Sequence, residues 1–319
     1  MQMTDMADSG SYSKKAKLRT QRMNYLRKSW QLYLMLVPVL LYYAVFSFGA
    51  YPGLMMAFQN YKISAGLFAS EFVGLKHFNV IFQSAGFAKI LRNTIFLNLL
   101  NLVLYFPAPI ILALMLNEVK HTSYKRISQS LMYLPHFFSW IVLGGMITQI
   151  LSPSRGVVNL ILEGITGETI FFMANKTIWP FIFVLSSMWK EVGWGTIIYL
   201  AAISGIDPEL YEAATIDGAG HFRQVLNITI PSISHTIIIL LILRMGSVLN
   251  VGIEQIMALS NAAVSEISDV IATYTYRMGV QNGQYSFTTA IGIFSSVVSL
   301  IMLLLANWFA KKYSESSIF

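Results

Sequence analysis

Six long apolar stretches, each separated from the next by a more polar segment, set the pattern of the chain. A helix needs about 20 mostly apolar residues to cross the hydrocarbon core of a bilayer, and each stretch reaches that length. The pattern therefore predicts an all-α polytopic membrane protein with six transmembrane helices. The spans are expected at residues 31–58, 93–117, 127–151, 178–203, 233–259 and 288–310.

The composition makes the bilayer the natural solvent of this chain. Of its 319 residues, 55% are hydrophobic and only 12% are charged, and the mean hydropathy is +0.59. A soluble chain carries roughly a quarter charged residues, so a soluble globular protein and a disordered chain are both excluded. The first apolar stretch is too long for a cleavable signal peptide and is expected to remain as an anchor. We therefore expect a transmembrane domain over 31–312, between tails at 1–30 and 313–319.

The positive charges are unevenly divided between the two sides of the predicted spans. The net charge is +7, and much of the excess lies in the N-terminal tail. Thirteen Lys and Arg residues fall on the side of the two tails and seven on the other side. By the positive-inside rule, both termini are cytoplasmic. A basic tail can bind nucleic acid, but beside a span it is more typical of a segment that fixes topology and contacts anionic lipid. No nucleic-acid partner is therefore expected.

The sequence contains no recognisable catalytic or metal-binding motif. It lacks the phosphate-binding G-x-x-x-x-G-K-[ST] loop, the H-E-x-x-H zinc helix and the G-x-S-x-G nucleophile turn. Its five histidines are scattered without an i, i+4 pair, and it has no cysteine. We therefore expect no catalytic residue, no metal and no cofactor bound by this chain. If transport is powered by ATP, the motor is another polypeptide.

The segment 204–232, between the fourth and fifth spans, is acidic although the charge count places it in the cytoplasm. Asp207 is a good helix N-cap, and Pro208 suits the first helical position. Gly218 then interrupts the helical pattern before a second short run leads to Pro231. The segment is predicted to form two short helices joined by a turn.

Six positions of this segment match a known motif at fixed spacing. Glu212, Ala213 and Ala214 are followed after three residues by Gly218 and after nine more by ITIP at 228–231. This pattern resembles the EAA loop in the membrane subunits of binding-protein-dependent ABC importers. The run YEAATIDGAGHFRQVLNITIP around it looks like the carbohydrate branch of that family.

The resemblance extends over nearly the whole chain. The chain looks like the oligosaccharide and polysaccharide permeases of the LplB type, with Ile230 as a conservative departure where leucine is usual. The further matching segments are WKEVGW at 189–194, LRMGSVLNVGIEQI at 243–256, TYTYRMG at 273–279 and NWFAKK at 307–312.

The resemblance implies a type I ABC importer fold in the bacterial cytoplasmic membrane, with 204–232 as the coupling loop. In that family the EAA loop forms a helix that docks into a cleft of the ATP-binding subunit. Glu212 would pair with a positive group there, and Ala213 and Ala214 would permit close approach. Asp217 belongs to the motif, and Gly218 would make the turn. The alternative is an amphipathic helix on the bilayer surface, which the deficit of Lys and Arg argues against.

The resemblance also implies a set of partners. These are a dimeric ATP-binding subunit that holds ATP and Mg, an extracytoplasmic solute-binding protein, a saccharide substrate and membrane lipid. One loop offers one contact to a two-fold ATPase, so a second permease must supply the other. The sugar branch usually uses a homologous second permease, which makes a heterodimer.

Charged residues within the predicted spans are the candidate substrate contacts. A charge that faces lipid at mid-depth costs about 2.5–3.5 kcal/mol, so these side chains are expected to face the bundle interior or a wet cavity. Related sugar permeases place substrate contacts at two positions relative to the EAA glutamate, and these fall on two predicted helical stripes. The stripes are Ser187, Lys190, Glu191 and Trp194 in the fourth span, and Arg244, Ser247, Val248 and Val251 in the fifth.

Two interpretations of these charges remain open. If Lys190 and Arg244 line the pathway, an acidic saccharide such as an alginate-like uronate oligomer fits, because ammonium and guanidinium groups suit carboxylates. Alternatively, Arg244 pairs with Glu191 and braces the bundle without touching substrate. The aromatic run at 273–277 is more typical of an interfacial belt with an arginine anchor than of a pathway mouth.

The sequence as a whole predicts one half of the pathway of an ATP-driven importer of oligosaccharides or polysaccharides that works by alternating access. Three alternatives are an ABC permease for a non-sugar cargo, a secondary transporter, and a membrane-embedded enzyme or scaffold. A secondary transporter needs coupling-ion sites and often has an internal repeat, and no repeat is visible here. The enzyme lacks a catalytic cluster.

Overall fold

The computed structural model describes residues 28–313, so most of the predicted N-terminal tail and nearly all of the C-terminal tail lie outside the described residues. The all-α prediction is confirmed: apart from one short antiparallel pair of strands, β1 (Gln59–Asn60) and β2 (Glu71–Phe72), the regular elements of the described chain are helical. In chain order these are α2 (Trp30–Tyr42), η1 (Tyr43–Ser47), η2 (Phe48–Phe58), α3 (Gly66–Ala69), α4 (Lys76–Gln83), α5 (Ala85–Leu104), α6 (Pro107–Asn117), α7 (Thr122–Tyr133), η3 (Leu134–Phe137), α8 (Trp140–Ile150), α9 (Val157–Thr166), η4 (Phe172–Ala174), α10 (Trp179–Ser204), α11 (Pro208–Ile216), α12 (His221–Gln224), η5 (Val225–Thr229), α13 (Ile230–Met245), α14 (Ile253–Leu259), α15 (Ser265–Ser268), α16 (Ile271–Thr275), η6 (Tyr276–Gln281) and α17 (Tyr285–Tyr313).

Helices cover all six predicted spans, although their boundaries and continuity differ. Within the described residues, four helical stretches are long and apolar enough to cross a membrane alone, and a bent pair is a fifth. The fourth predicted span corresponds to the 26-residue helix α10, which carries the adjacent charges Lys190 and Glu191 near its middle. The second span begins at Ala85 instead of residue 93, because the Ser84 hydroxyl caps it by accepting a hydrogen bond from the Phe87 amide at 3.3 Å.

The third predicted span is not one straight helix. Its two halves, Thr122–Phe137 and Trp140–Ile150, meet at an angle of 103°. Pro135 lies in the 3-10 turn η3 just before the bend. The helix restarts at Trp140, and the hydroxyl of its N-cap Ser139 accepts a hydrogen bond from the Val142 amide at 3.4 Å. We refer to this point as the first break.

The predicted fifth span, 233–259, is wrong as a single helix. Helix α13 ends at Met245, a turn follows at 246–249, and residues 250–252 are irregular before the chain resumes in the seven-residue helix α14. The predicted stripe from Arg244 to Val251 is therefore also wrong, because only its first member lies on α13. Sequence pattern alone misses this second break because Val248, Leu249 and Val251 keep the segment apolar.

The two short helices that follow the breaks pack against each other. A Cβ atom at Gly144 of α8 would lie 2.7 Å from the Cβ atom of Ala258 in α14, a separation that folded proteins essentially never show. Glycine is thus required for the close approach of these backbones. The contact joins segments that lie more than one hundred residues apart in sequence.

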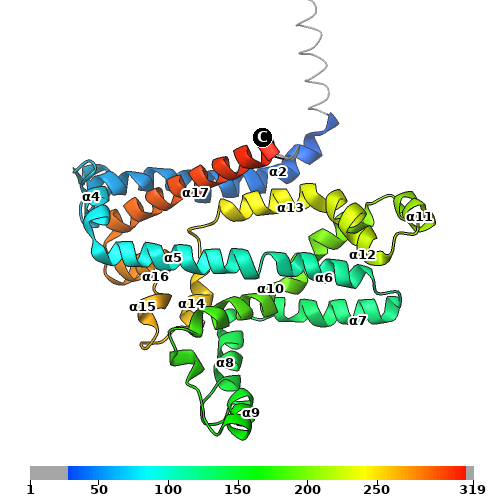
Figure 1. The fold of residues 1–319 in the computed structure, drawn as a ribbon. Helices are drawn as coiled ribbons and strands as arrows, with labels where there is room; N and C mark the ends of the chain where they lie inside the picture. The colour runs from blue at the N-terminus through cyan, green and yellow to red at the C-terminus, as the bar shows by residue number, and fades with distance from the viewer. Residues whose placement is uncertain (1–27, 314–319) are drawn as a thin grey trace, which may run out of the picture.

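The long helices run side by side, with α4 at one end of the molecule and α11 at the other (Figure 1). The start of α2 and the end of α17 lie away from α4, while α8 and α9 project sideways from the bundle. An apolar cluster around Phe87, Ile90 and Ile291 packs the α4 end, and a second around Trp179 and Phe183 packs the middle. Two of the segments that connect the predicted spans are themselves folded: 59–92 contains β1, β2, α3 and α4, and 152–177 contains α9 and η4.

Candidate functional site

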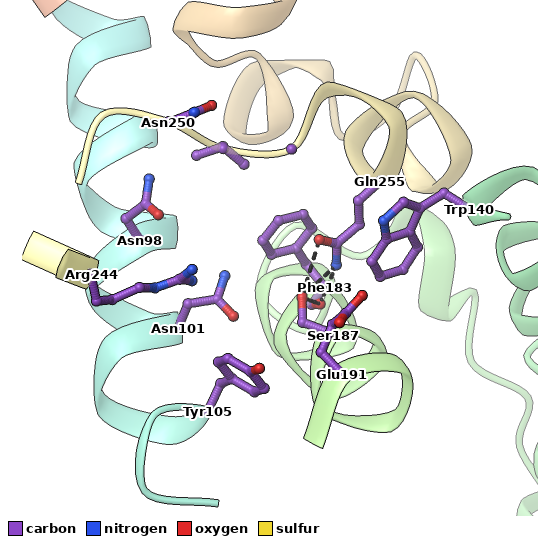
Figure 2. Close-up of a pocket in the computed structure, with 12 residues that line it drawn as sticks. Asn98, Asn101, Tyr105, Trp140, Phe183, Ser187, Glu191, Arg244, Asn250 and Gln255 are labelled. Atoms are coloured by element: carbon purple, nitrogen blue, oxygen red, sulfur yellow. Dashed lines mark hydrogen bonds between the residues drawn. The ribbon is translucent and has the colours of Figure 1, made fainter. Parts of the chain in front are cut away.

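A central cavity of about 290 Å³ lies where both breaks and two long helices meet. Helix α5 and its C-terminal cap contribute Asn98, Asn101 and Tyr105 to one wall, and α10 faces them across the cavity (Figure 2). The remaining lining comes from the end of α13, from the second break and α14, and from Trp140 at the start of α8. The site is thus assembled from four of the six predicted spans.

Amide and hydroxyl groups are prominent in the lining of this cavity. The amide nitrogen of Gln255 donates to the Phe183 carbonyl at 2.7 Å and lies 2.8 Å from the Ser187 hydroxyl oxygen, which holds α14 against α10. In contrast, the Oδ1 atom of Asn101 is buried and accepts no hydrogen bond within the described chain. A buried acceptor without a partner loses free energy, so a ligand that donates a hydrogen bond there is favoured.

Arg244 brings a positive charge into the central cavity from the end of α13 (Figure 2). Its guanidinium carbon lies 5.8 Å from the centre of the Tyr105 ring, within the range of a cation–π contact. No carboxylate of the described chain forms an ion pair with it. The predicted alternative, an internal pair of Arg244 with Glu191, is therefore wrong in this conformation.

Glu191 has other partners. One of its carboxylate oxygens lies 2.7 Å from Nδ1 of His136, and the other lies 3.8 Å from Nζ of Lys190. The imidazole of His136 also stacks on Trp194, with ring centres 4.4 Å apart and an angle of 2° between the planes. These contacts join α10 to the residues immediately before the first break.

Lys190 is 7% exposed and stabilises the first break through hydrogen bonds to its backbone. Its ammonium group donates to the carbonyl of His136 at 2.5 Å and to the carbonyl of Phe138 at 2.7 Å. A bend of 103° leaves carbonyls at this point without helical partners, and the ammonium group supplies donors to them. Of the two cations predicted to line the pathway, Arg244 lines the central cavity. Lys190 points into the bundle and does not line it.

The predicted substrate residues accordingly fall into two groups. Ser187, Glu191, Arg244 and Val251 line the central cavity, whereas Lys190, Trp194, Ser247 and Val248 do not. Contact of any of these residues with a substrate stays a prediction. Sequence reasoning missed Asn98, Asn101 and Tyr105, although amide side chains in a long apolar run are a signal of a buried polar site in a membrane helix.

The segment 204–232 has the predicted form. The Asp207 carboxylate accepts a hydrogen bond from the Glu209 amide at 3.0 Å, α11 begins at Pro208, and Gly218 turns the chain with φ of +75°. The hydroxyls of Tyr211 and Thr229 lie 2.9 Å apart and fasten α11 to the residue that precedes α13.

The motif residues of this loop lie at its surface. Glu212, Ala213, Asp217 and Gly218 are exposed and Ala214 is half-buried, and no hydrogen bond or ion pair within the described chain occupies the Glu212 carboxylate. Two large apolar side chains are also exposed there, Ile216 at 87% and Phe222 at 78%. Sequence reasoning did not single these out, and an exposed apolar pair on a turn is typical of a surface that a partner covers.

The fold and the position of the loop define the class of this protein. Residues 105–315 match the family of binding-protein-dependent transport system inner membrane components. The chain belongs to this family, and it is a membrane permease component of such a transport system. The secondary-transporter and enzyme alternatives are therefore set aside.

Particular relatives support the assignment over nearly the full length. The chain is 44% identical over 293 residues to protein LplB of Bacillus subtilis, and the match covers 92% of each chain. It is 43% identical over 288 residues to the polygalacturonan/rhamnogalacturonan transport system permease protein YteP of the same organism, covering 90% of each. A crystal structure of a bacterial alginate ABC transporter, in complex with an alginate pentasaccharide-bound periplasmic protein, contains a chain with a TM-score of 0.84 and 39% identity. That match covers 92% of this chain and 99% of that chain.

Proposed function

We propose that this chain forms one half of the pathway of an ATP-driven importer for an acidic oligosaccharide or polysaccharide. The observation that carries the proposal is Arg244, a guanidinium group in the central cavity without a carboxylate partner in the described chain. Guanidinium groups bind carboxylates through paired hydrogen bonds. A uronate unit would thus place its carboxylate at Arg244 and its hydroxyls against the amides of the lining.

The rest of the lining suits a sugar ring. Tyr105 and Trp140 supply aromatic surfaces, while Asn101 offers an unpaired buried acceptor. Sites for small molecules combine apolar and aromatic walls with a few placed polar groups. The relatives whose names include polygalacturonan and alginate make the acidic class the one to test first.

We further propose that the α11 end faces the cytoplasm and contacts a separate ATP-binding subunit. In this arrangement Glu212 would meet a positive group, and the exposed Ile216 and Phe222 would be covered by the same partner. ATP and Mg would be bound by that subunit, and a second permease would complete the pathway. An extracytoplasmic binding protein would deliver the saccharide at the α4 end, and both termini would be cytoplasmic.

The substrate proposal is tested by ATPase stimulation in the reconstituted complex, with polygalacturonan fragments and their methyl-esterified, uncharged forms as probes. Arg244→Gln should raise the half-saturating concentration of the acidic fragment about tenfold to a hundredfold, since a charge-assisted pair is lost. Arg244→Lys should recover part of this loss. The esterified fragment should respond equally in native protein and variant, and a preference for it in the native complex would contradict the acidic assignment.

The coupling proposal is tested in the same assay. Glu212→Lys should abolish stimulation while the complex still assembles, because the reversed charge repels the proposed positive partner. Glu209→Lys is the matched control, since it places the same charge on an exposed position of the same short helix. Normal stimulation in Glu212→Lys would mean that α11 does not transmit the ATPase cycle.

A further inference from the structure

A second cavity, of about 450 Å³, lies at the α4 end and is distinct from the central cavity. It is formed by β1, by α4, by the cap of α5 and by the segment that leads from α16 into α17. Its lining includes Asn60, Tyr61, Tyr274, Gln284, Tyr285 and Ser286. We call it the outer cavity.

The two cavities share the helix α5 but are well separated along it. Ser84, the cap of α5, lines the outer cavity, and Asn98 lines the central one. At 1.5 Å per helical residue these positions are about 21 Å apart. Phe87 and Ile90, which lie between them, are buried in the apolar cluster of the α4 end. The outer cavity is therefore a separate site in this conformation.

The walls of the outer cavity are held in place by contacts between distant parts of the chain. The Tyr61 amide donates to the Ser286 hydroxyl at 2.9 Å, and the rings of Tyr61 and Tyr285 meet edge to face with centres 6.0 Å apart. On the far wall, the Tyr274 ring packs edge to face on Phe287, with centres 6.1 Å apart. The aromatic surfaces are thus fixed before any ligand arrives.

Several polar groups of this lining are available to a ligand. No hydrogen bond within the described residues uses the side-chain amides of Asn60 and Gln284 or the hydroxyls of Tyr61, Tyr274 and Tyr285. The lining contains no lysine, arginine or carboxylate side chain. Aromatic faces beside uncharged amides and hydroxyls fit a sugar ring, and they provide no counter-charge for an ion.

We propose that the outer cavity is a second saccharide-binding site, which holds the faces and hydroxyls of sugar rings without reading their charge. It rests on the proposed function for the saccharide class and for the orientation of the α4 end. It differs from the central cavity in chemistry, because only the central cavity has a guanidinium group. An incoming saccharide would contact the outer cavity first and meet charge selection at Arg244 afterwards.

The native chain has no cysteine, so one introduced thiol reports on one site. In the assembled complex in membranes, Gln284→Cys would be labelled with a maleimide, with and without polygalacturonan fragments, and labelling would be read on this chain. A saturating fragment should slow labelling at least about fivefold. Gln281→Cys is the matched control, since this position is also exposed, lies in the same segment and lines a different pocket. Its labelling rate should not change.

Further comparisons identify the ligand chemistry. The methyl-esterified fragment should protect Gln284→Cys as well as the acidic fragment does, since no lysine, arginine or carboxylate side chain lines the outer cavity. Adding Tyr285→Ala should remove the protection, whereas Tyr276→Ala should leave it, because the two tyrosines are similarly exposed at 36% and 38% but only Tyr285 lines this cavity.

Unchanged labelling of Gln284→Cys, or equal protection of Gln281→Cys, would overturn the proposal. Protection by the sugar-free binding protein but not by the fragment alone would mean that a protein loop fills the cavity, and would also overturn it. The ATPase assay separates the two proposals. Protection without stimulation of ATPase would contradict the proposed function alone, and stimulation without protection would contradict the outer site alone.

Discussion

The two breaks in the transmembrane helices use charged residues in opposite ways. At the first break, Lys190 donates to the carbonyls of residues 136 and 138, so its ammonium group stabilises the backbone of the bend. At the second break, backbone hydrogen bonds between residues three apart close the turns. Arg244 therefore keeps its guanidinium group in the central cavity. A charged residue in a membrane helix is thus not necessarily a substrate contact. Its role depends on whether backbone carbonyls beside it lack hydrogen-bond donors.

The largest expected effect is the loss of stability when Lys190 is replaced, and it tests whether the two cations have different roles. Lys190→Met removes the donors from two carbonyls at a buried position and should lower the free energy of unfolding by about 3 kcal/mol. Thermal unfolding of the purified protein in detergent measures this. Arg244→Met is the matched variant, since it also replaces one cation, and it should keep nearly native stability. Equal destabilisation of both variants would mean that the two cations have the same role.

The contact between α8 and α14 links the two breaks, and one methyl group tests it. Gly144→Ala places a Cβ atom against Ala258 and should cost about 1–3 kcal/mol of stability. Gly145→Ala is the control, because nothing lies within 4 Å of a Cβ atom at the neighbouring position. The melting temperatures of the two variants give the comparison, and equal values would show that the helices do not approach this closely.

The caps of the two short helices differ as well. Ser139 caps α8 through its hydroxyl, whereas Gly252 precedes α14 and has no side chain to do so. Ser139→Ala should therefore cost about 1 kcal/mol. Ser139→Asp, which restores an acceptor, should recover most of the loss in the same unfolding measurement. If Ser139→Ala were as stable as the native protein, the hydroxyl would not contribute to the stability of the first break.

The smallest effect concerns the segment that follows the second break. Hydrogen bonds from Lys176 and Lys89, at 2.5 and 3.0 Å, lower the pKa of Glu266 from 4.5 to about 2. Because the folded-state pKa is the lower one, the ion pairs add stability above about pH 4.5 and lose it as pH falls towards 2. Half-exposed pairs contribute little. Between pH 5 and 8, Glu266→Gln should thus lower the melting temperature only slightly, and this difference should disappear as the pH falls towards 2. A destabilisation that is largest near pH 2 would contradict the assigned ion pairs.

The sequence predicted the local structure of the segment 204–232 well, but it missed features that depend on residues far apart in the chain. The cap at Asp207 and the turn at Gly218 depend on neighbouring residues only, so their pattern was sufficient. The breaks depend on packing between distant helices, and the second occurs in a run that stays apolar. The placement of Lys190 likewise depends on carbonyls more than 50 residues away, which no helical stripe reveals.

Helix α13 connects the two ends of the proposed mechanism as a rigid rod. Its 16 residues span about 24 Å, with the Tyr211–Thr229 contact next to one end and Arg244 near the other. A tilt of about 10° around the loop end would move the guanidinium group sideways by about 4 Å, a little less than the rise of one helical turn. In the proposed mechanism, the hydroxyl pair at 2.9 Å would act as the pivot, and the length of α13 would set how far Arg244 moves when the proposed ATP-binding partner displaces the loop.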